Sequence, residues 1–316
     1  MSRIMRAACH AVGAPEDLFQ CIERPSIPMT QYLMESCDLT LATGGKPMVQ
    51  AAYSSGKPAY GVGAGNSTIV VDETADLNEA AKNIMISKTS DFGSGCSADG
   101  NIVIQKSIYS NMVSELQANN GYLCNSAEKE LLSRAMWDNK ENRTFSTIAC
   151  KPQQLALVAG FEIPEHIKFL MVENNGQIGK EHKFSKEKLT TLMALYYFEE
   201  FPDALNIIQK IYEVGGKGHS CGIYSTSDKN IDALARVAPV SRMMVRQPQS
   251  KSNAGSWTNG MPMTSSLGCG IWGGNITNEN VTMKHMMNYT WVSKPIQEDR
   301  PSERELFGEF FGQEVA

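Results

Sequence analysis

The sequence predicts an α/β fold with a largely parallel sheet. Short apolar runs alternate with longer segments of helical periodicity along most of the chain, which is typical of parallel strands covered by helices. Near the N-terminus, a short strand, a pair of glycines at 44 and 45, a helix ending near Gly56 and the run PAYGVG follow one another. This order of strand, turn, helix and strand is a βαβ unit.

The individual elements follow from their residues. Residues 76–90 begin with acidic side chains and place apolar residues at helical spacing, so they predict an amphipathic helix that leads to Cys96. Other helices are predicted in the first dozen residues, where Gly13 ends the helix, and at 28–36, 107–118, 126–137, 201–216 and 230–238. Strands are predicted at 37–43, 58–63, 101–105, 169–174, 191–199, 221–225 and 243–247.

Composition narrows the function classes. The 316 residues are 42% hydrophobic, which suffices for one large core or two domains, and the net charge of -5 indicates neither a nucleic-acid partner nor an acidic membrane surface. The chain has no apolar run long enough to span a membrane, and its first residues lack a signal-peptide core, so we expect a cytoplasmic protein. The eight cysteines form no CxxC pair, which favours free thiols and no metal site.

Cys96 is the first candidate for chemistry. It lies in DFGSGCSADG, a loop of small residues that follows the helix of residues 76–90. Backbone N–H groups in such a turn can favour a thiolate, and they can bind the oxyanion that forms when a thiolate attacks a carbonyl. The alternative is an inert cysteine in a tight turn.

Glycine-rich turns provide further candidates. The segment ATGGKPMV at 42–49 presents N–H groups at a helix start, where a phosphate can bind. The segments at 61–66 and 265–275 are also rich in glycine, either for close packing or to line a ligand. His219, in GGKGHSCG, can be a base, a ligand for a bound group or a turn residue.

Two arginines precede the third of these turns. Alternation along a strand places Arg242 and Arg246 on the same side, from which they can bind a sulfonate or carboxylate through paired hydrogen bonds, with Lys251 and residues 264–266 nearby. The alternative is that these cations are solvated or paired with acidic neighbours.

Taken together, these stretches resemble the CoA-acylating branch of the aldehyde dehydrogenase superfamily. The stretches are ATGGKPMVQAAYSSGKPAYGVGAGN, VDETADL, SKTSDFGSGCSADGNIVI, KEKLTTLMALY, GGKGHSCGIYS and SSLGCGIWGGNITNENVTMKH. The version RQPQSKSNAGSWTNG, with WVSKPIQEDRPS after it, looks most like the sulfoacetaldehyde dehydrogenases of that branch. The resemblance implies a homo-oligomer with an aldehyde dehydrogenase-like fold.

The resemblance also implies an activity. Cys96 would attack a small aldehyde, hydride would pass to NAD or NADP, and coenzyme A would take the acyl group from the resulting thioester. Hydrolytic members of the superfamily carry a water-activating glutamate where this chain has Gly61, which favours CoA over water. Sulfoacetaldehyde is the favoured substrate and acetaldehyde the next.

Other site residues are carried over from the family. Thr43, Gly44 and Gly45 match the turn near the nicotinamide and phosphates. Glu187 in KEKL matches the glutamate that holds the nicotinamide ribose, although Thr191 stands where many relatives have proline. His219 matches the histidine of GGxGH.

The implied organisation is a partial Rossmann-type cofactor domain followed by an α/β catalytic domain. We expect residues 1–66 to be the remnant of the cofactor-binding domain, 67–284 to form the catalytic domain with Cys96, and 285–316 to form a C-terminal arm. The resemblance implies that the front of the cofactor domain, with an asparagine that completes the oxyanion hole, is not part of this sequence. We therefore expect an N-terminally truncated member with little activity by itself; the alternative is an inactive fragment that at most associates with complete subunits.

Overall fold

The computed structural model describes residues 1–310. The chain divides into two units, Met1–Thr282 and a second that begins at Met283. The second unit contains the short helix α11 (Glu303–Phe307), and its side chains between Met286 and Phe310 are exposed.

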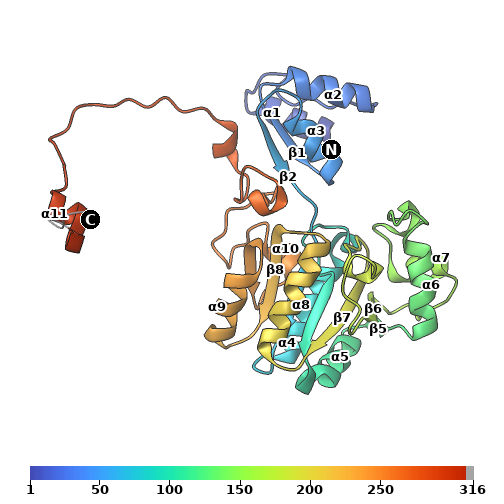
Figure 1. The fold of residues 1–316 in the computed structure, drawn as a ribbon. Helices are drawn as coiled ribbons and strands as arrows, with labels where there is room; N and C mark the ends of the chain where they lie inside the picture. Colours follow the sequence, from blue (N-terminus) through green and yellow to red (C-terminus); the bar gives the residue numbers. More distant parts are fainter. Residues whose placement is uncertain (311–316) are drawn as a thin grey trace. The chain divides into compact units, whose positions relative to one another are not determined.

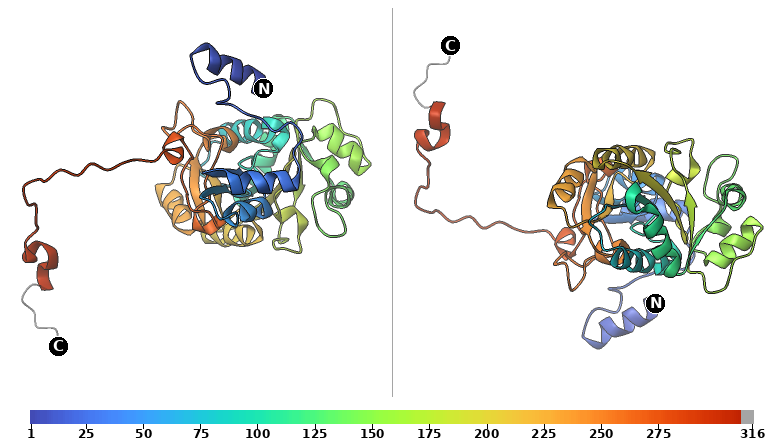
Figure 2. Two further views of the ribbon diagram at one scale, coloured as in Figure 1. Left: turned by 90° about the horizontal axis from the view of Figure 1, so that it is seen from above. Right: turned by 90° about the horizontal axis from the view of Figure 1, so that it is seen from below.

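A seven-stranded sheet dominates the first unit (Figures 1 and 2). All of its strand pairs are parallel, in the order β5-β6-β7-β4-β3-β8-β9. The strands are β3 (Thr68–Val71), β4 (Asn101–Gln105), β5 (Gly121–Leu123), β6 (Phe169–Glu173), β7 (Leu192–Phe198), β8 (Gly218–Tyr224) and β9 (Val240–Val245). The predicted α/β class with a parallel sheet is confirmed.

Helices cover both faces of this sheet. Apolar side chains of α4 (Leu77–Thr89) and α5 (Tyr109–Ala118) pack on one face. The other face packs against α6 (Ser126–Met136), α7 (Pro152–Ala159), α8 (Phe201–Val214) and α9 (Asp228–Val237). Because both faces are buried, β3, β4 and β7 are apolar at most positions.

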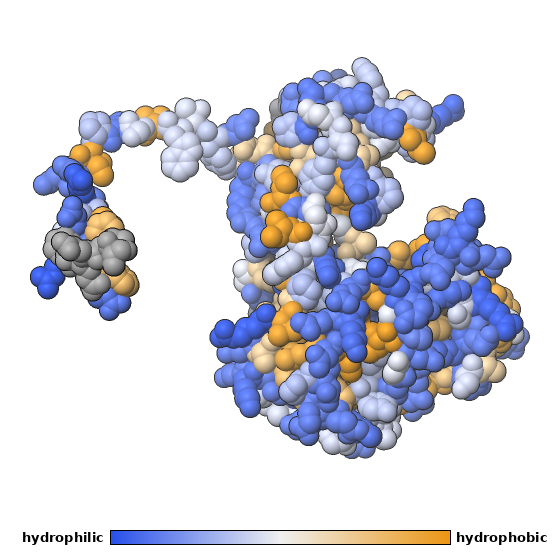
Figure 3. Space-filling model, in the orientation of Figure 1, coloured by the Kyte–Doolittle hydropathy of each residue, from blue (hydrophilic) through white to orange (hydrophobic). Residues whose placement is uncertain are grey.

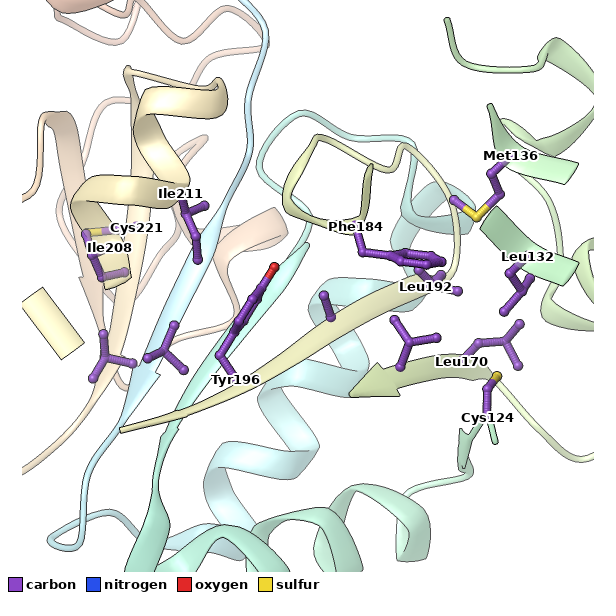
Figure 4. Packing of buried hydrophobic residues seen from close by; sticks show 14 of the residues in the cluster. Cys124, Leu132, Met136, Leu170, Phe184, Leu192, Tyr196, Ile208, Ile211 and Cys221 are labelled. Carbon is purple, nitrogen blue, oxygen red and sulfur yellow. The ribbon is translucent and has the colours of Figure 1, made fainter. Parts of the chain in front are cut away.

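Figure 4 shows the larger of the two cores from close by. Tyr196 of β7 lies between two groups of side chains, with Ile208 and Ile211 of α8 on one side and Leu170 and Phe184 on the other. These side chains pack the helices of this face against the sheet.

A smaller layer precedes the large sheet. Strands β1 (Thr40–Thr43) and β2 (Ala59–Val62) pair in parallel through α3 (Lys46–Tyr53), which confirms the predicted βαβ unit. Helices α1 (Ser2–Ala11) and α2 (Ile27–Ser36) come before it. In α1 no residue is buried and in α2 only Met34 is, so much of the apolar surface of residues 1–33 is exposed; apolar patches are visible on the surface in Figure 3.

The strands β3 and β5 and the helix α7 were not among the predicted elements, and neither were α11 and a short helix after β9. The short helix α10 (Gln249–Ser252) follows β9. Among the predicted elements, β8 begins at Gly218, three residues earlier than the predicted strand of 221–225, so His219 lies in a strand rather than in a turn.

Candidate active site

Cys96 lies at the amino edge of the seven-stranded sheet. Helix α4 runs along the sheet toward this edge and ends at Thr89, and β4 begins at Asn101. The turn between them is tight, because Asp91 and Phe92 adopt φ values of 46° and 52°. The loops that precede β3, β7 and β8 reach the same edge because all these strands are parallel.

The glycine-containing segment 63–66, which follows β2, packs directly against Cys96. An added Cβ at Gly65 would lie 1.8 Å from the carbonyl oxygen of Cys96, so only glycine permits this approach. Two residues earlier, the Cβ position of Gly63 lies 3.8 Å from the Sγ atom of Cys269. The segment 63–66 therefore runs between the Cys96 loop and the loop that contains Cys269.

The environment of Cys96 does not favour the thiolate in the absence of ligands. The residue is partly buried, and burial raises the pKa of its thiol to about 11, with further increases from Glu187 and Cys269. A backbone hydrogen bond and the charge of Arg242 act in the opposite direction. The predicted thiolate-favouring effect of the turn is thus present but is outweighed by desolvation.

The structure brings Glu187 to the same place. Its Oε1 atom accepts a hydrogen bond of 3.1 Å from the backbone N–H of Gly65. Burial raises the pKa of this carboxyl to about 7, while the Gly65 bond and nearby lysines lower it. Glu187 and Cys96 line a common cavity of about 10 Å³, which is about the space of one water molecule.

A fully buried polar network supports the floor of this cavity. The Nζ atom of Lys188 donates to Asn101 Oδ1 at 2.8 Å, and Asn101 Nδ2 donates to Asn66 Oδ1 at 3.0 Å. Asn66 in turn donates to the backbone oxygen of Ser185 at 2.8 Å. These bonds join the amino ends of β3, β4 and β7, so the three loops around Cys96 are held together.

Thr43, Gly44 and Gly45 lie at the carboxyl end of β1 and the start of α3. The hydroxyl oxygens of Thr43 and Ser266 are 3.3 Å apart, which links this turn to the glycine-rich segment 265–275. A cleft of about 630 Å³ lies between α3, the end of α8 and this segment. Its lining includes Lys46, Tyr53, Gly63, Lys217 and Trp272.

His219 is completely buried in β8. Burial, followed by the charge of Arg242, lowers the pKa of its imidazole to about 3, so the ring is neutral. Its Nδ1 atom lies 2.9 Å from Ser220 Oγ, and within residues 1–310 its Nε2 atom has no hydrogen-bond partner. His219 is connected to the site through Arg242, because the backbone oxygen of His219 accepts a hydrogen bond from the Arg242 guanidinium.

Arg242 is a buried cation beside two thiols. Its guanidinium donates to the backbone oxygens of His219 at 3.2 Å, Gly268 at 2.6 Å and Asn278 at 3.0 Å. The pKa of Cys96 and that of Cys269 are both lowered by its charge. No ion pair within residues 1–310 includes this side chain, so its positive charge is available to the site.

The structure does not bring Arg246 to Cys96. Strand β9 ends at Val245, and Arg246 adopts a φ of 54°, so the strand alternation that would align it with Arg242 no longer applies. Its guanidinium pairs with Glu79 in the first turn of α4 at 3.0 Å, whereas Cys96 follows the other end of that helix. The expectation that both arginines project to one side is wrong, and Arg246 is an ion-paired surface residue at the carboxyl edge of the sheet.

The sequence interpretation missed three charged residues of this site. Lys88, Asp99 and Arg143 lie close enough to Glu187 or to each other to shift one another's pKa values. Lys88 and Asp99 are almost completely buried. Helical spacing contained a signal for the first of them, because Lys88 continues the buried face formed by Ala80, Ala81 and Ile84.

Within the described part of the chain, no group of three His, Cys, Asp or Glu residues is arranged to hold a metal ion. Among the same residues, no helix is both long enough and apolar enough to cross a membrane.

Comparisons with known proteins agree with this fold. The aldehyde dehydrogenase family model matches residues 1–125. A sulfoacetaldehyde dehydrogenase of Acholeplasma is 42% identical over 97% of this chain and 64% of its own length. An acylating sulfoacetaldehyde dehydrogenase of Bilophila wadsworthia is 39% identical over 98% of this chain and 67% of its own length.

Solved structures give the same result. An acetylating aldehyde dehydrogenase of Geobacillus thermoglucosidasius has a TM-score of 0.90 and 37% identity, over 95% of this chain and 66% of that one. A propionaldehyde dehydrogenase of Rhodopseudomonas palustris with bound propionyl-CoA has a TM-score of 0.76 and 25% identity, over 87% of this chain and 60% of that one.

The fold and the cysteine loop define an aldehyde dehydrogenase-type α/β protein. More narrowly, the chain belongs to the acylating aldehyde dehydrogenase family. It spans about two thirds of the length of the two sulfoacetaldehyde dehydrogenases above, 64% for the Acholeplasma protein and 67% for the Bilophila protein.

Proposed function

We propose that this protein oxidises a small aldehyde to an acyl-CoA thioester, reversibly, with NAD or NADP as the hydride acceptor. Cys96 is the nucleophile, and the observation that supports this most directly is its place in a glycine-lined loop beside Glu187. Cys221 and Cys269 also lie in stretches that carry the family resemblance, but both are completely buried.

The residues divide the chemistry as follows. The Cys96 sulfur bonds to the aldehyde carbon, and backbone N–H groups of the cysteine loop stabilise the resulting oxyanion. A bound nicotinamide supplies the hydride acceptor. The CoA thiol loses its proton to solvent, the resulting CoA thiolate attacks the thioester that remains on Cys96, and the Cys96 thiolate leaves.

The absence of a side chain at Gly61 favours CoA over water as the acyl acceptor. A Cβ at this position would lie 2.5 Å from Val49 Cγ1 and 2.7 Å from the Tyr53 hydroxyl oxygen. That hydroxyl already accepts the backbone N–H of Gly61 at 3.0 Å and of Ile276 at 3.2 Å. A water-activating glutamate does not fit here unless α3 moves, so hydrolysis of the thioester lacks its usual base.

The cleft beside α3 suits the phosphate-bearing ligands of this reaction. Its volume of about 630 Å³ is in the usual range for ligand sites. Lys46 and Lys217 supply positive charge, and the glycines of segments 215–216 and 273–274 allow close approach to the backbone. We propose that Thr43, Gly44, Gly45 and Glu187 bind the nicotinamide cofactor and that part of this cleft receives CoA.

In a length-completed protein, aldehyde-dependent reduction of the nicotinamide cofactor is expected to require CoA. The steady-state rate should fall by roughly 100-fold or more when CoA is omitted, which is the scale of a missing general base. The rate is measured from the absorbance of the reduced nicotinamide cofactor. Desulfo-CoA is the matched control, since this analogue has no thiol but keeps the rest of the CoA molecule. Equal turnover with and without CoA contradicts the acylating reaction, and acid production without CoA would identify a hydrolytic enzyme.

Sulfoacetaldehyde is our favoured substrate, on the basis of the names of the two relatives above and of the uncompensated charge of Arg242. We expect kcat/KM for sulfoacetaldehyde to exceed that for acetaldehyde by about tenfold or more, as an anion gains from a nearby buried cation. The substitution Arg242→Gln should reduce this ratio, while Arg246→Gln, at the carboxyl edge of the sheet, should leave it unchanged. A preference for acetaldehyde in the unsubstituted protein would exclude the anionic substrate and leave the acylating chemistry intact.

A further inference from the structure

Lys88 is a buried amine in the last turn of α4. Its side chain is 1% exposed, and it lines the same water-sized cavity as Cys96, Glu187 and Lys188. Within residues 1–310 it forms no ion pair and no side-chain hydrogen bond, whereas the similarly buried Lys188 donates to Asn101 and to a backbone oxygen. An amine without a partner in such a place is costly for the fold and suggests a chemical role.

The proposed reaction leaves a proton without an acceptor. Cys96 must lose its thiol proton to attack an aldehyde, yet burial raises the pKa of this thiol to about 11, so only on the order of one thiol in a thousand ionises near pH 8. Gly61 provides no side chain that could take the proton. A base near the thiol is therefore needed.

We propose that Lys88 is the general base that accepts the Cys96 proton, through a water molecule in the cavity that both residues line. This inference rests on the proposed function of Cys96 as the nucleophile. The water gives one proton to Nζ of Lys88 and takes the proton of the Cys96 thiol, while the sulfur electron pair forms the bond to the aldehyde carbon. When the thioester is transferred to CoA, Cys96 leaves as a thiolate, and the ammonium of Lys88 is available to return a proton to it.

The surroundings of Lys88 are tuned for this exchange. Burial lowers the pKa of its amine to about 7, and the positive charge of Arg143 lowers it further. The carboxyls of Asp99 and Glu187 act in the opposite direction and stabilise the ammonium once it has formed. Lys188 completes the charged groups around it, and its own pKa is lowered in part by Lys88. The amine is thus neutral at the start of the reaction near pH 8 and can hold the proton after it.

Other groups fit this role less well. Glu187 is held by the Gly65 N–H, in the position expected to bind the nicotinamide ribose. Asp99 is completely buried, and Gln249 donates to its Oδ1 atom at 2.9 Å. Asp99 does not line the cavity next to Cys96.

The pH dependence of Cys96 alkylation tests the proposal without aldehyde, CoA or cofactor. Iodoacetamide labelling of the purified protein is followed at Cys96 by peptide mass spectrometry between pH 6 and 10, for the unsubstituted chain and for Lys88→Met, Lys88→Arg and Lys188→Met. We expect the rate at Cys96 in the unsubstituted protein to rise through an inflection near pH 7. In Lys88→Met the inflection should disappear, and labelling at pH 8 should be about 100-fold slower.

The variant Lys88→Arg distinguishes a role of Lys88 as a base from a role of its positive charge alone. Arginine keeps the positive charge but does not deprotonate, so Lys88→Arg should be as slow as Lys88→Met. If Lys88→Arg keeps the original profile, Lys88 acts only through its charge and the proposal is wrong. It is also wrong if Lys188→Met loses the inflection as Lys88→Met does, because the effect then belongs to the charged cluster as a whole.

Two other cysteines control for unfolding in the same experiment. Cys21 is exposed and should label at one rate in all variants, while Cys221 is completely buried and should stay unlabelled in a folded chain. If Cys221 is labelled in a variant, that variant is unfolded and is set aside. The pH profile of Cys96 labelling in the unsubstituted protein then tests the proposal, and the absence of an inflection near pH 7 in that profile overturns it. A length-completed protein that shows this inflection but does not oxidise aldehydes would contradict the proposed function and not the role of Lys88.

Discussion

In a length-completed enzyme, replacing Cys96 with alanine is expected to abolish CoA-dependent aldehyde oxidation, with a loss in kcat of roughly 10⁴-fold or more. The reason is that the sulfur forms the covalent bond on which both half-reactions depend, and removal of a covalent nucleophile has effects of this size in other enzymes. Stability should change little, because the residue is only partly buried and alanine keeps its backbone contact with Gly65. Nicotinamide reduction in the presence of aldehyde and CoA measures the activity, and thermal unfolding measures the stability.

Two matched variants make this result specific. Cys21→Ala removes an exposed thiol that lies outside the site and should retain full activity. Cys269→Ala removes a buried thiol close enough to Cys96 to affect its pKa, and a moderate effect is expected because Cys269 has no covalent role in the reaction. Retention of more than a tenth of the activity by Cys96→Ala would mean that another thiol is the nucleophile.

Much of the fold could be predicted because its strands are buried on both faces. Continuous apolar runs such as those of β4, β6 and β7 are easily distinguished from the amphipathic helices between them. The strand β3 was missed although it is also apolar, because it has only four residues and the DETADL segment follows it directly. The strand β5 has only three residues, and its glycine gives no β signal.

The predictions for the site differed in accuracy for physical reasons. Motif position assigned Cys96 and Glu187 to one site, and in the structure both border one small cavity. Arg246 was misplaced because alternation applies only while a strand continues, and the backbone turns at this residue. Lys88 was overlooked because a lysine in an amphipathic helix is usually solvated, and only its phase relative to Ala80, Ala81 and Ile84 indicates burial.

The electrostatics of the site depend on groups that are far apart in the sequence. Lys88, Asp99, Arg143 and Glu187 come from four separate segments, and each shifts the pKa of at least one of the others. Burial is the largest cause for Lys88, Asp99 and Glu187, and it moves the pKa of each to about 7. Groups of opposite charge that titrate in one range can exchange protons at little cost, which suits a site that must take up and return a proton in each cycle.

Substitution of Gly65 by alanine is expected to be severe. The new Cβ would lie 1.8 Å from the carbonyl oxygen of Cys96 and 2.7 Å from its carbonyl carbon, and backbone atoms cannot rotate away as a side chain can. Either the segment 63–66 or the cysteine loop must then shift, which displaces the nucleophile and weakens the bond from Gly65 to Glu187. We expect a destabilisation of about 1–3 kcal/mol, as for an overpacked core, and a loss of roughly 100-fold in kcat/KM, as for a misplaced reacting group.

Gly63→Ala is the matched control for this prediction. It lies two residues away in the same segment, yet its Cβ would meet only Asn275, Cys269 and Gly273, each at 3.8 Å, which is ordinary van der Waals contact. This variant should unfold within about 1 kcal/mol of the unsubstituted protein in urea and should keep most of its activity. Equal effects of the two substitutions would show that flexibility of the glycine segment matters rather than its contact with Cys96. A Gly65→Ala variant that stays stable and active would show that the cysteine loop can move without loss of the site.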